Sequence, residues 1–219
     1  MSWNRDDHRR RRGYHHGNLR EALIQAALEL ISNKGPAGFT FAEAARYAGV
    51  SPAAPYRHYR DRDALMADVA RRGFEQFAAA LTKAWDEGRP TPSAAFERLG
   101  RAYLDFARRE PAYFSAMFES GLDLKSFPAV QEAADSAFAV LRGACEVLVS
   151  TLPPARRPPA LMMALHVWSL AHGIASLFGR GDAARRPIPM TPEELLEAAM
   201  LVYMQGLGFG PTESGSAQG

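Results

Sequence analysis

Glycine and proline most strongly constrain how this chain folds, because they cut it into segments of helical length. Gly35-Pro36, Gly88-Arg89-Pro90 and the proline-rich run 153–159 separate long stretches that are rich in alanine and leucine. No stretch alternates apolar and polar side chains with the period of a strand and the turn residues that bound one. The sequence therefore predicts an all-α protein, whose 219 residues suffice for one large domain or two small ones.

Capping residues and apolar periodicity predict where the helices begin and end. Thr40 and Glu43 have the spacing of a capping box, in which each side chain accepts a hydrogen bond from the other residue's amide. Ser51 is expected to cap a short helix whose first residue is Pro52, where a missing N–H costs nothing. Asp61 is expected to cap the long helix that follows. The remaining expected helices span about residues 18–34, 61–87, 92–109, 111–120, 128–152, 160–179 and 191–206.

Charge is distributed unevenly along the chain. Residues 1–62 contain 11 Lys and Arg against 6 Asp and Glu, a balance of +5, whereas residues 63–219 contain 15 against 18, a balance of −3. A basic N-terminal part on a mildly acidic body indicates that only the N-terminal part meets a polyanion. The arm of residues 1–13 holds five of the arginines. This arm can reach into a DNA minor groove, or add only nonspecific attraction.

Several classes of protein are disfavoured by the sequence. Cys145 is the single cysteine, so no internal disulfide and no thiolate metal cluster can form, and we expect it in the core. His166 and His172 are six residues apart and lack a Cys or acidic companion at metal-ligand spacing. There is neither a glycine-rich phosphate loop after a strand nor a G-x-S-x-G elbow. The N-terminus lacks the apolar stretch of a signal peptide. We therefore expect a cytoplasmic protein that is not an enzyme and uses no metal and no cofactor.

The first three expected helices have the arrangement of a helix-turn-helix. Gly49 is expected to end the second helix, and bulk at Gly49 is expected to push the second and third helices apart. On the third helix, Pro55 and Tyr59 are four residues apart and are expected to face the core. The opposite face then carries small residues and Tyr56 and Arg57, which suits a DNA major groove. An arginine can pair with a guanine edge or a phosphate, and a tyrosine hydroxyl can hold a phosphate.

Residues 14–70 resemble the DNA-binding domain of TetR-family transcriptional regulators, and the stretch YRHYRDRDAL at 56–65 carries the family's Tyr-x-His-Phe signature. Tyr59 replaces the usual phenylalanine, and Arg62 stands where lysine is common. The resemblance implies that the sugar–phosphate backbone is contacted by Thr40, Ser51, Tyr56, His58 and Arg62. It also implies that the bases are faced by Ala42, Pro52, Ala53, Ala54 and Arg57.

The C-terminal part carries a second pattern, Trp168-x-x-x-His172-Gly173, in which Gly173 is expected to let another element come close. It resembles the signature of TetR-family regulators with a WHG-type C-terminal domain, which implies a ligand-sensing body whose last two helices, about 160–179 and 191–206, pair with those of a second copy. Large aromatic and Met side chains can line an apolar ligand cavity or fill a core. The candidate ligand-binding residues are Tyr103, Phe106, Tyr113, Phe114, Met117, Phe118, Trp168 and His172. The alternative is that Trp168 and His172 are a packed pair.

These observations predict a basic arm at 1–13, a helix-turn-helix domain at 14–62, a helical regulatory and dimerisation domain at 63–210 and a disordered tail at 211–219. We expect a homodimeric DNA-binding transcriptional regulator that binds a palindromic operator and responds to a small, largely apolar effector, as a repressor. One alternative is a constitutive DNA-binding dimer without a ligand. The other is an all-helical enzyme or carrier that uses Trp168 and His172.

Overall fold

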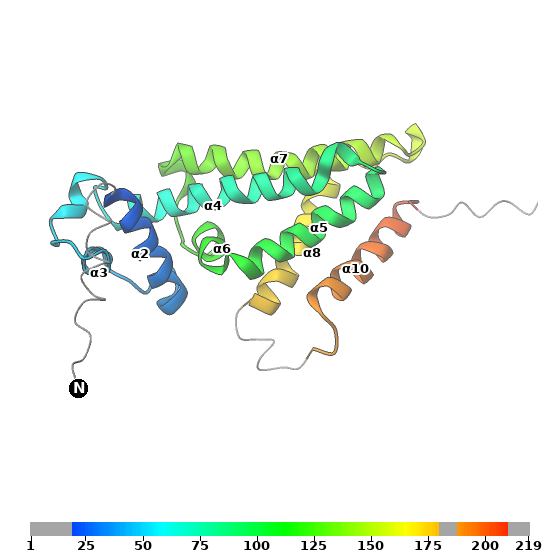
Figure 1. Cartoon of the computed structure of the whole chain (residues 1–219). Helices are drawn as coiled ribbons and strands as arrows, with labels where there is room; N and C mark the ends of the chain where they lie inside the picture. Colours follow the sequence, from blue (N-terminus) through cyan, green and yellow to red (C-terminus); the bar gives the residue numbers. More distant parts are fainter. Residues whose placement is uncertain (1–18, 180–187, 210–219) are drawn as a thin grey trace, which may run out of the picture. The chain divides into compact units, whose positions relative to one another are not determined.

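The computed structural model describes residues 19–179 and 188–209, and every regular element within them is helical (Figure 1). The predicted arm at 1–13 and the predicted tail at 211–219 lie outside the described residues. The chain divides into two compact units, Met1–Gln76 with Glu110–Ala134 and Phe77–Arg109 with Asp135–Gly219. This division reflects contacts within the folded chain, and the functional boundary expected after residue 62 stays a prediction.

The first unit is built on α2 (Leu19–Lys34), which packs against α3, η1 and α6. Its buried centre includes Leu23 and Ile24 of α2 and Leu65, Met66 and Val69 of α4, all with no exposed surface. Complete burial of such side chains contributes about 1.5–3 kcal/mol each. The other elements of this unit are α3 (Phe41–Tyr47), η1 (Ala54–Arg57), the start of α4 (Arg62–Trp85), α6 (Pro111–Phe118), η3 (Leu124–Ser126) and the start of α7 (Pro128–Ser150).

The second unit is organised around α5 (Pro92–Arg109), which packs against α8 and α10, while α8 also packs against α10. A capping box at Thr191 and Glu194 starts α10. Cys145 is fully buried, as expected. The other elements of this unit are the end of α4, η2 (Asp86–Gly88), the rest of α7, η4 (Pro154–Arg156), α8 (Ala160–Gly179) and α10 (Pro192–Gly206).

The predicted α-helix after Ser51 is wrong. The chain instead forms the 3₁₀-helix η1, which begins at Ala54 and has no side-chain cap. The physical reason is the pair Pro52 and Pro55, neither of which has an amide hydrogen to donate. The carbonyl of Ser51 therefore accepts its bond from the amide of Ala54, three residues on, at 3.0 Å. Three-residue spacing is that of a 3₁₀-helix.

The expectation for Gly49 is half right. Gly49 has φ +72°, the left-handed conformation that a glycine adopts at least cost, so it ends α3 as predicted. The second expectation was that bulk at this position would push two helices apart. A Cβ built there meets no described atom within 4 Å. Backbone conformation, and not crowding, therefore requires this glycine.

Candidate nucleic-acid interface and effector pocket

The start of α3 is fixed by the predicted capping box. The Thr40 hydroxyl accepts from the Glu43 amide at 3.2 Å, and a Glu43 carboxylate oxygen accepts from the Thr40 amide at 2.9 Å. Lys34 donates to the other carboxylate oxygen at 2.7 Å. These bonds, that from Lys34 first, lower the pKa of Glu43 from 4.5 to about 2. A phosphate approaching Thr40 would therefore meet an ionised carboxylate whose charge Lys34 offsets.

The two sides of η1 differ as the sequence predicts. Pro55 and Tyr59 are buried, whereas Tyr56 and Arg57 are exposed. The carbonyl of Pro55 accepts hydrogen bonds from the amides of His58 at 2.9 Å and Tyr59 at 3.0 Å. These two hydrogen bonds close the turn immediately after Tyr56 and Arg57. The same turn therefore places Pro55 in the core and exposes Tyr56 and Arg57.

Tyr56 is held in place by a neighbouring ring although 63% of it is exposed. Its ring meets the ring of Phe41 edge to face, with centroids 5.0 Å apart and planes at 83°. Edge-to-face pairs of this kind contribute about 0.5–1.5 kcal/mol beyond the area they bury. Phe41 is the first residue of α3, so this contact links the phenol of η1 to the preceding helix.

Nine of the ten predicted DNA-contact residues lie on the surface or at its edge. Only Ala54 among these nine is half-buried. The exposed ones are Thr40, Ala42, Ser51, Pro52, Ala53, Tyr56, Arg57 and His58.

Arg62, the tenth, is half-buried and bound to the protein itself. Its guanidinium donates to the main-chain carbonyls of Phe39, at 3.0 Å, and of Pro36. The guanidinium also lies 4.9 Å from the centre of the Phe39 ring. Arg62 therefore holds the connection between α2 and α3 in place, a role that the sequence analysis missed.

A buried carboxylate, Asp68, ties the end of η1 to α2 and α4. Asp68 is 6% exposed and accepts hydrogen bonds from the Tyr59 hydroxyl at 2.7 Å, from Arg20 at 3.0 Å and from Arg71 at 2.7 Å. Arg72 lies 3.7 Å from the same carboxylate. Burial acts to raise the pKa of Asp68, but the three hydrogen bonds outweigh burial and leave that pKa below its ordinary value. Burial and the bond to Asp68 raise the pKa of Tyr59.

In the second unit, Trp168 and His172 belong to a chain of packed side chains. The Tyr103 hydroxyl and His172 Nδ1 are 2.9 Å apart, and the Trp168 and His172 rings are 5.9 Å apart. Tyr103 is 3% exposed, and burial raises its pKa. Gly173 was expected to let another element approach, but a Cβ built there meets no described atom within 4 Å. That expectation is wrong for contacts within the described residues.

The eight predicted ligand-binding residues are divided equally between the two units. Tyr103, Phe106, Trp168 and His172 lie in the second unit, where the Phe106 and Tyr103 rings each stand 5.0 Å from the ring of Phe77. The other four lie on α6 in the first unit, where they contact one another or α4: Tyr113, Phe114, Met117 and Phe118.

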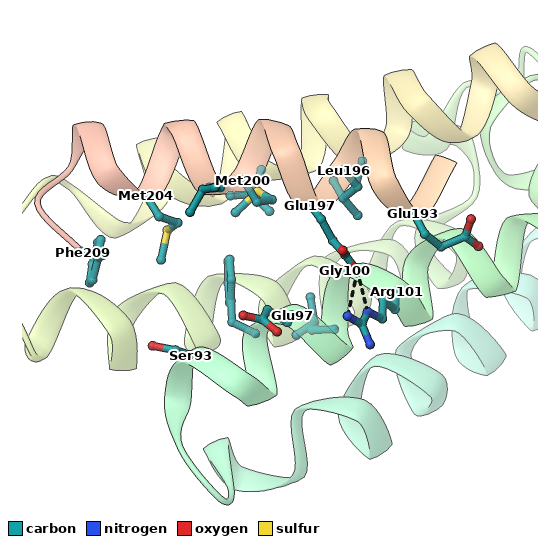
Figure 2. A pocket seen from close by; sticks show the side chains of 15 residues that line it. Ser93, Glu97, Gly100, Arg101, Glu193, Leu196, Glu197, Met200, Met204 and Phe209 are labelled. Carbon is teal, nitrogen blue, oxygen red and sulfur yellow. Dashed lines mark hydrogen bonds and ion pairs between the residues drawn. The ribbon is translucent and has the colours of Figure 1, made fainter. Parts of the chain in front are cut away.

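A pocket of about 380 Å³ lies elsewhere in the second unit, between α5, α8 and α10 (Figure 2). None of the eight predicted residues lines it. On α10, Leu196, Met200 and Met204 recur every four residues and so occupy one face of the helix, which is the only sequence signal that could have pointed to this wall. Figure 2 shows these side chains above Glu97 and Arg101 of α5.

Large apolar side chains are exposed on α8 and α10. They include Leu161, Leu165 and Leu177 on α8 and Leu201 and Val202 on α10, the last being 71% exposed. Among the described helices, α8 alone is long and apolar enough to cross a membrane by length and composition. Such a helix is weak evidence for a membrane span, because the core helices of soluble proteins pass the same test.

Two family profiles match the chain. The profile "Bacterial regulatory proteins, tetR family" matches residues 23–69, and the profile "Tetracyclin repressor-like, C-terminal domain" matches residues 96–203. The first covers most of α2 and all of α3 and η1, and the second covers α8 and most of α5 and α10, the helices that line the pocket. The WHG subtype inferred from Trp168 stays a prediction.

Curated relatives match over part of their length. The uncharacterized HTH-type transcriptional regulator YobS of Bacillus subtilis (strain 168) is 29% identical over 104 residues, which are 46% of this chain and 51% of that protein. The nucleoid occlusion factor SlmA of Vibrio cholerae is 30% identical over 95 residues, which are 43% of this chain and 48% of that protein. The chain thus spans about half the length of the curated relatives it matches.

Solved structures match over nearly the whole chain. A Rhodococcus sp. RHA1 protein of unknown function is 30% identical with a TM-score of 0.74, and the match covers 89% of this chain and 97% of that one. The TetR family transcriptional regulator PfmR from Thermus thermophilus is 20% identical with a TM-score of 0.63, and the match covers 87% of this chain and 99% of that one. At that identity the second match shows likeness of fold.

Proposed function

Since the chain belongs to the TetR family of bacterial transcriptional regulators, we propose that it binds a palindromic operator as a homodimer and that a small effector bound in its helical body changes this binding. The observation that carries the proposal is the division of η1 into a buried side and an exposed side. Pro55 and Tyr59 anchor the turn in the core, and Tyr56 and Arg57 project outward beside exposed Pro52.

This exposed side has the chemistry that duplex DNA requires. Pro52 and Ala53 are small enough to let the backbone approach the groove and to lie against a thymine methyl group. The guanidinium group of Arg57 can donate hydrogen bonds to a guanine edge or to a phosphate, and the Tyr56 hydroxyl can donate to a phosphate. The basic balance of residues 1–62 adds attraction that does not depend on base sequence.

The exposed apolar side chains of α8 and α10 support pairing with a second copy. Leu165 of α8 is 43% exposed in the single chain, and Leu201 and Val202 of α10 are 59% and 71% exposed. Burying such side chains against the same surface of another copy would give a symmetric interface. Helix-turn-helix dimers place their recognition elements about 34–36 Å apart, one turn of the duplex, which is why the operator should be palindromic.

A bound effector can act by favouring one separation of the two recognition elements over another. A differential affinity of about 1–3 kcal/mol for two such shapes changes operator affinity by roughly 5–150-fold. Under this proposal the chain acts as a repressor in the cytoplasm, released from DNA when the effector accumulates.

Footprinting on the DNA that flanks the protein's own gene tests the proposal. We expect a protected palindrome whose affinity falls by about 10³–10⁵ between 50 and 200 mM salt, as for a dimer that contacts ~6–10 phosphates. Arg57→Ala should weaken operator binding by about tenfold or more. The matched control is Arg142→Ala, which removes an exposed arginine that pairs with Glu146 on α7 and should leave binding unchanged. A monomer in solution, or equal affinity for operator and scrambled duplex, would contradict the proposal.

A second candidate function is constitutive DNA binding without an effector. The observation in its favour is that the Tyr103 hydroxyl and His172 Nδ1 are 2.9 Å apart, which is how a filled core satisfies its polar groups. The two candidates differ in one measurement, the affinity for the operator across a panel of small molecules. A constitutive regulator shows the same affinity with every compound.

A further inference from the structure

We propose that the pocket between α5, α8 and α10 binds an amphipathic organic cation, an amine or guanidine group attached to an apolar body. This inference rests on the proposed function only for the role of that cation as an effector. The binding itself is argued from the pocket's walls, its charges and its volume of about 380 Å³, which lies within the ~300–1,000 Å³ usual for small-molecule sites.

The walls supply the apolar part of the site. The lining includes Phe96 and Leu99 of α5 and Val167 and Ala171 of α8, and α10 adds a row of three side chains. Two members of that row are methionines, Met200 and Met204, whose unbranched side chains can adapt to ligands of different outline. The pocket can therefore accommodate apolar ligand bodies of moderate size that differ in shape.

Gly100 sets the width of the pocket between α5 and α10. A Cβ at this position would stand 3.1 Å from Cδ2 of Leu196, closer than ordinary van der Waals contact. An alanine here would require the Leu196 side chain to move by a few tenths of an ångström. Adding a methyl group here should push Leu196 into the pocket and reduce the volume available to a ligand.

The charges on the pocket favour a cation. Its lining includes the carboxylates of Glu97, Glu193 and Glu197 and one guanidinium, that of Arg101. Arg101 is committed to Glu197, with Nη2 at 2.7 Å and Nε at 3.1 Å from the same oxygen. Glu193 lies 3.8 Å from Arg108. The lining thus carries more negative than positive charge.

Glu97 is the carboxylate that distinguishes ligands by charge. Within residues 19–179 and 188–209 it has no ion pair, and Figure 2 shows it pointing into the space between α5 and α10. Glu97 is exposed, so water screens its charge, and it favours a cation only when the ligand's charged group lies beside it at the edge of the pocket. An anionic ligand would be repelled by Glu97, and a neutral ligand would leave it unpaired.

Three probes with the same apolar body test the proposal: 4-phenylbutylamine, 4-phenylbutan-1-ol and 4-phenylbutyrate. Isothermal titration calorimetry on the full chain should show the amine binding about tenfold more tightly than the alcohol, and the carboxylate binding most weakly. Glu97→Gln should remove this tenfold preference while leaving the affinity for the alcohol unchanged. The matched control is Glu132→Gln, which changes an exposed carboxylate of α7 that is not part of the pocket and should alter nothing.

A second variant separates the pocket's shape from its charge. Gly100→Ala should weaken the amine and the alcohol by the same factor, because it narrows the space without touching Glu97. The proposal is overturned if the alcohol or the carboxylate binds as tightly as the amine, if no probe binds, or if the Glu97 variant keeps the preference. If side chains of a second copy fill the pocket in the dimer, no probe will bind, and the proposal is overturned in that case too.

Failure of this inference can be told apart from failure of the proposed function. Calorimetry measures binding without DNA, and operator affinity is measured separately with and without the amine. Amine binding that depends on Glu97 but leaves operator affinity unchanged supports the site and contradicts its role as an effector site. Operator binding that persists while no probe binds contradicts the site and leaves DNA recognition standing.

Discussion

The first unit and the second unit use their polar side chains in different ways. In the first, Asp68 is enclosed by three hydrogen-bond donors, while Arg57 of the proposed DNA-contact surface is exposed. In the second, Glu97 and Arg101 stand at the edge of a pocket with apolar walls. The first unit therefore presents a preorganised surface, whose side chains are held in position before a partner binds. The second unit presents a pocket that a ligand must fill.

The largest expected effect comes from removing the buried carboxylate of Asp68, which tests whether the polar network of the first unit stabilises the fold. Asp68→Ala leaves the Tyr59 hydroxyl and the guanidinium of Arg71 without their buried acceptor, so we expect it to lower the free energy of unfolding by about 3 kcal/mol. Denaturant unfolding of the full chain measures this. Asp63→Ala, which removes a largely exposed carboxylate one turn earlier, should cost less than about 0.5 kcal/mol. If both variants lowered the free energy of unfolding by the same amount, the buried hydrogen bonds of Asp68 would contribute no more to stability than an exposed carboxylate does.

The same network makes stability depend on pH in a defined direction. The pKa of Asp68 is lower in the folded chain than its ordinary 3.8, so its contribution is fully present above that value and is lost as the pH falls through the folded-state pKa. Asp68→Asn cannot titrate. The difference in stability between the wild type and this variant should therefore shrink on acidification below pH 3.8 and stay constant above it.

The next prediction sets a glycine of the first unit against one of the second. Gly49→Ala meets no crowding, but its φ of +72° is strained for any residue with a Cβ, so we expect a loss of about 1–2 kcal/mol. Gly143→Ala, within α7 and equally uncrowded, should instead stabilise the chain by about 0.5–1 kcal/mol, because alanine is the better helix former. Thermal unfolding of both variants checks the signs, and a loss at both positions would contradict the argument.

Much of the first unit could be predicted from the sequence because its signals are local. Thr40 caps α3, and Asp61 caps α4 by accepting from the amide of Ala64 at 2.8 Å, both as expected. A cap or a proline acts within one helical turn, so its effect can be read without knowing what packs against it. The form of η1 was missed although its cause is also local, because Pro52 and Pro55 together change which carbonyls within that turn can be paired.

The pocket and the role of Arg62 could not be predicted, because both depend on residues far apart in the sequence. Arg62 donates to carbonyls 23 and 26 residues earlier, Phe39 and Pro36. Arg101 and Glu197 pair across 96 residues. No helical period brings such residues together. The aromatic residues of α6 drew attention because they are large, yet size favours burial in a core as much as a place on a pocket wall.

Removing the Tyr56 hydroxyl tests whether the surface of the first unit is preorganised. Tyr56→Phe keeps the ring against Phe41 but loses the group proposed to hold a phosphate, so operator affinity should fall by about tenfold, and equally for operators of different base sequence. Phe41→Leu keeps the hydroxyl but removes the ring that orients it, and should give a smaller loss. Fluorescence anisotropy with labelled duplexes measures both. A loss confined to one base sequence would assign Tyr56 to base reading instead.

The smallest expected effect concerns Glu43, which is half-buried and has its pKa lowered to about 2 by hydrogen bonds from Lys34 and the Thr40 amide. Glu43→Gln keeps the capping pattern, since glutamine can also accept from Thr40, and loses only the charge. The charged form is favoured in the folded chain, so its contribution is complete above pH 4.5 and is lost as the pH falls to about 2. We expect a Tm lower by a few degrees at most for the variant at pH 7, and a difference that closes between pH 4.5 and 2. The matched control is Glu29→Gln, at an exposed position on α2, which should leave the Tm at pH 7 unchanged. A Tm gap that persists at pH 2 would mean that packing, and not charge, distinguishes glutamate from glutamine at the start of α3.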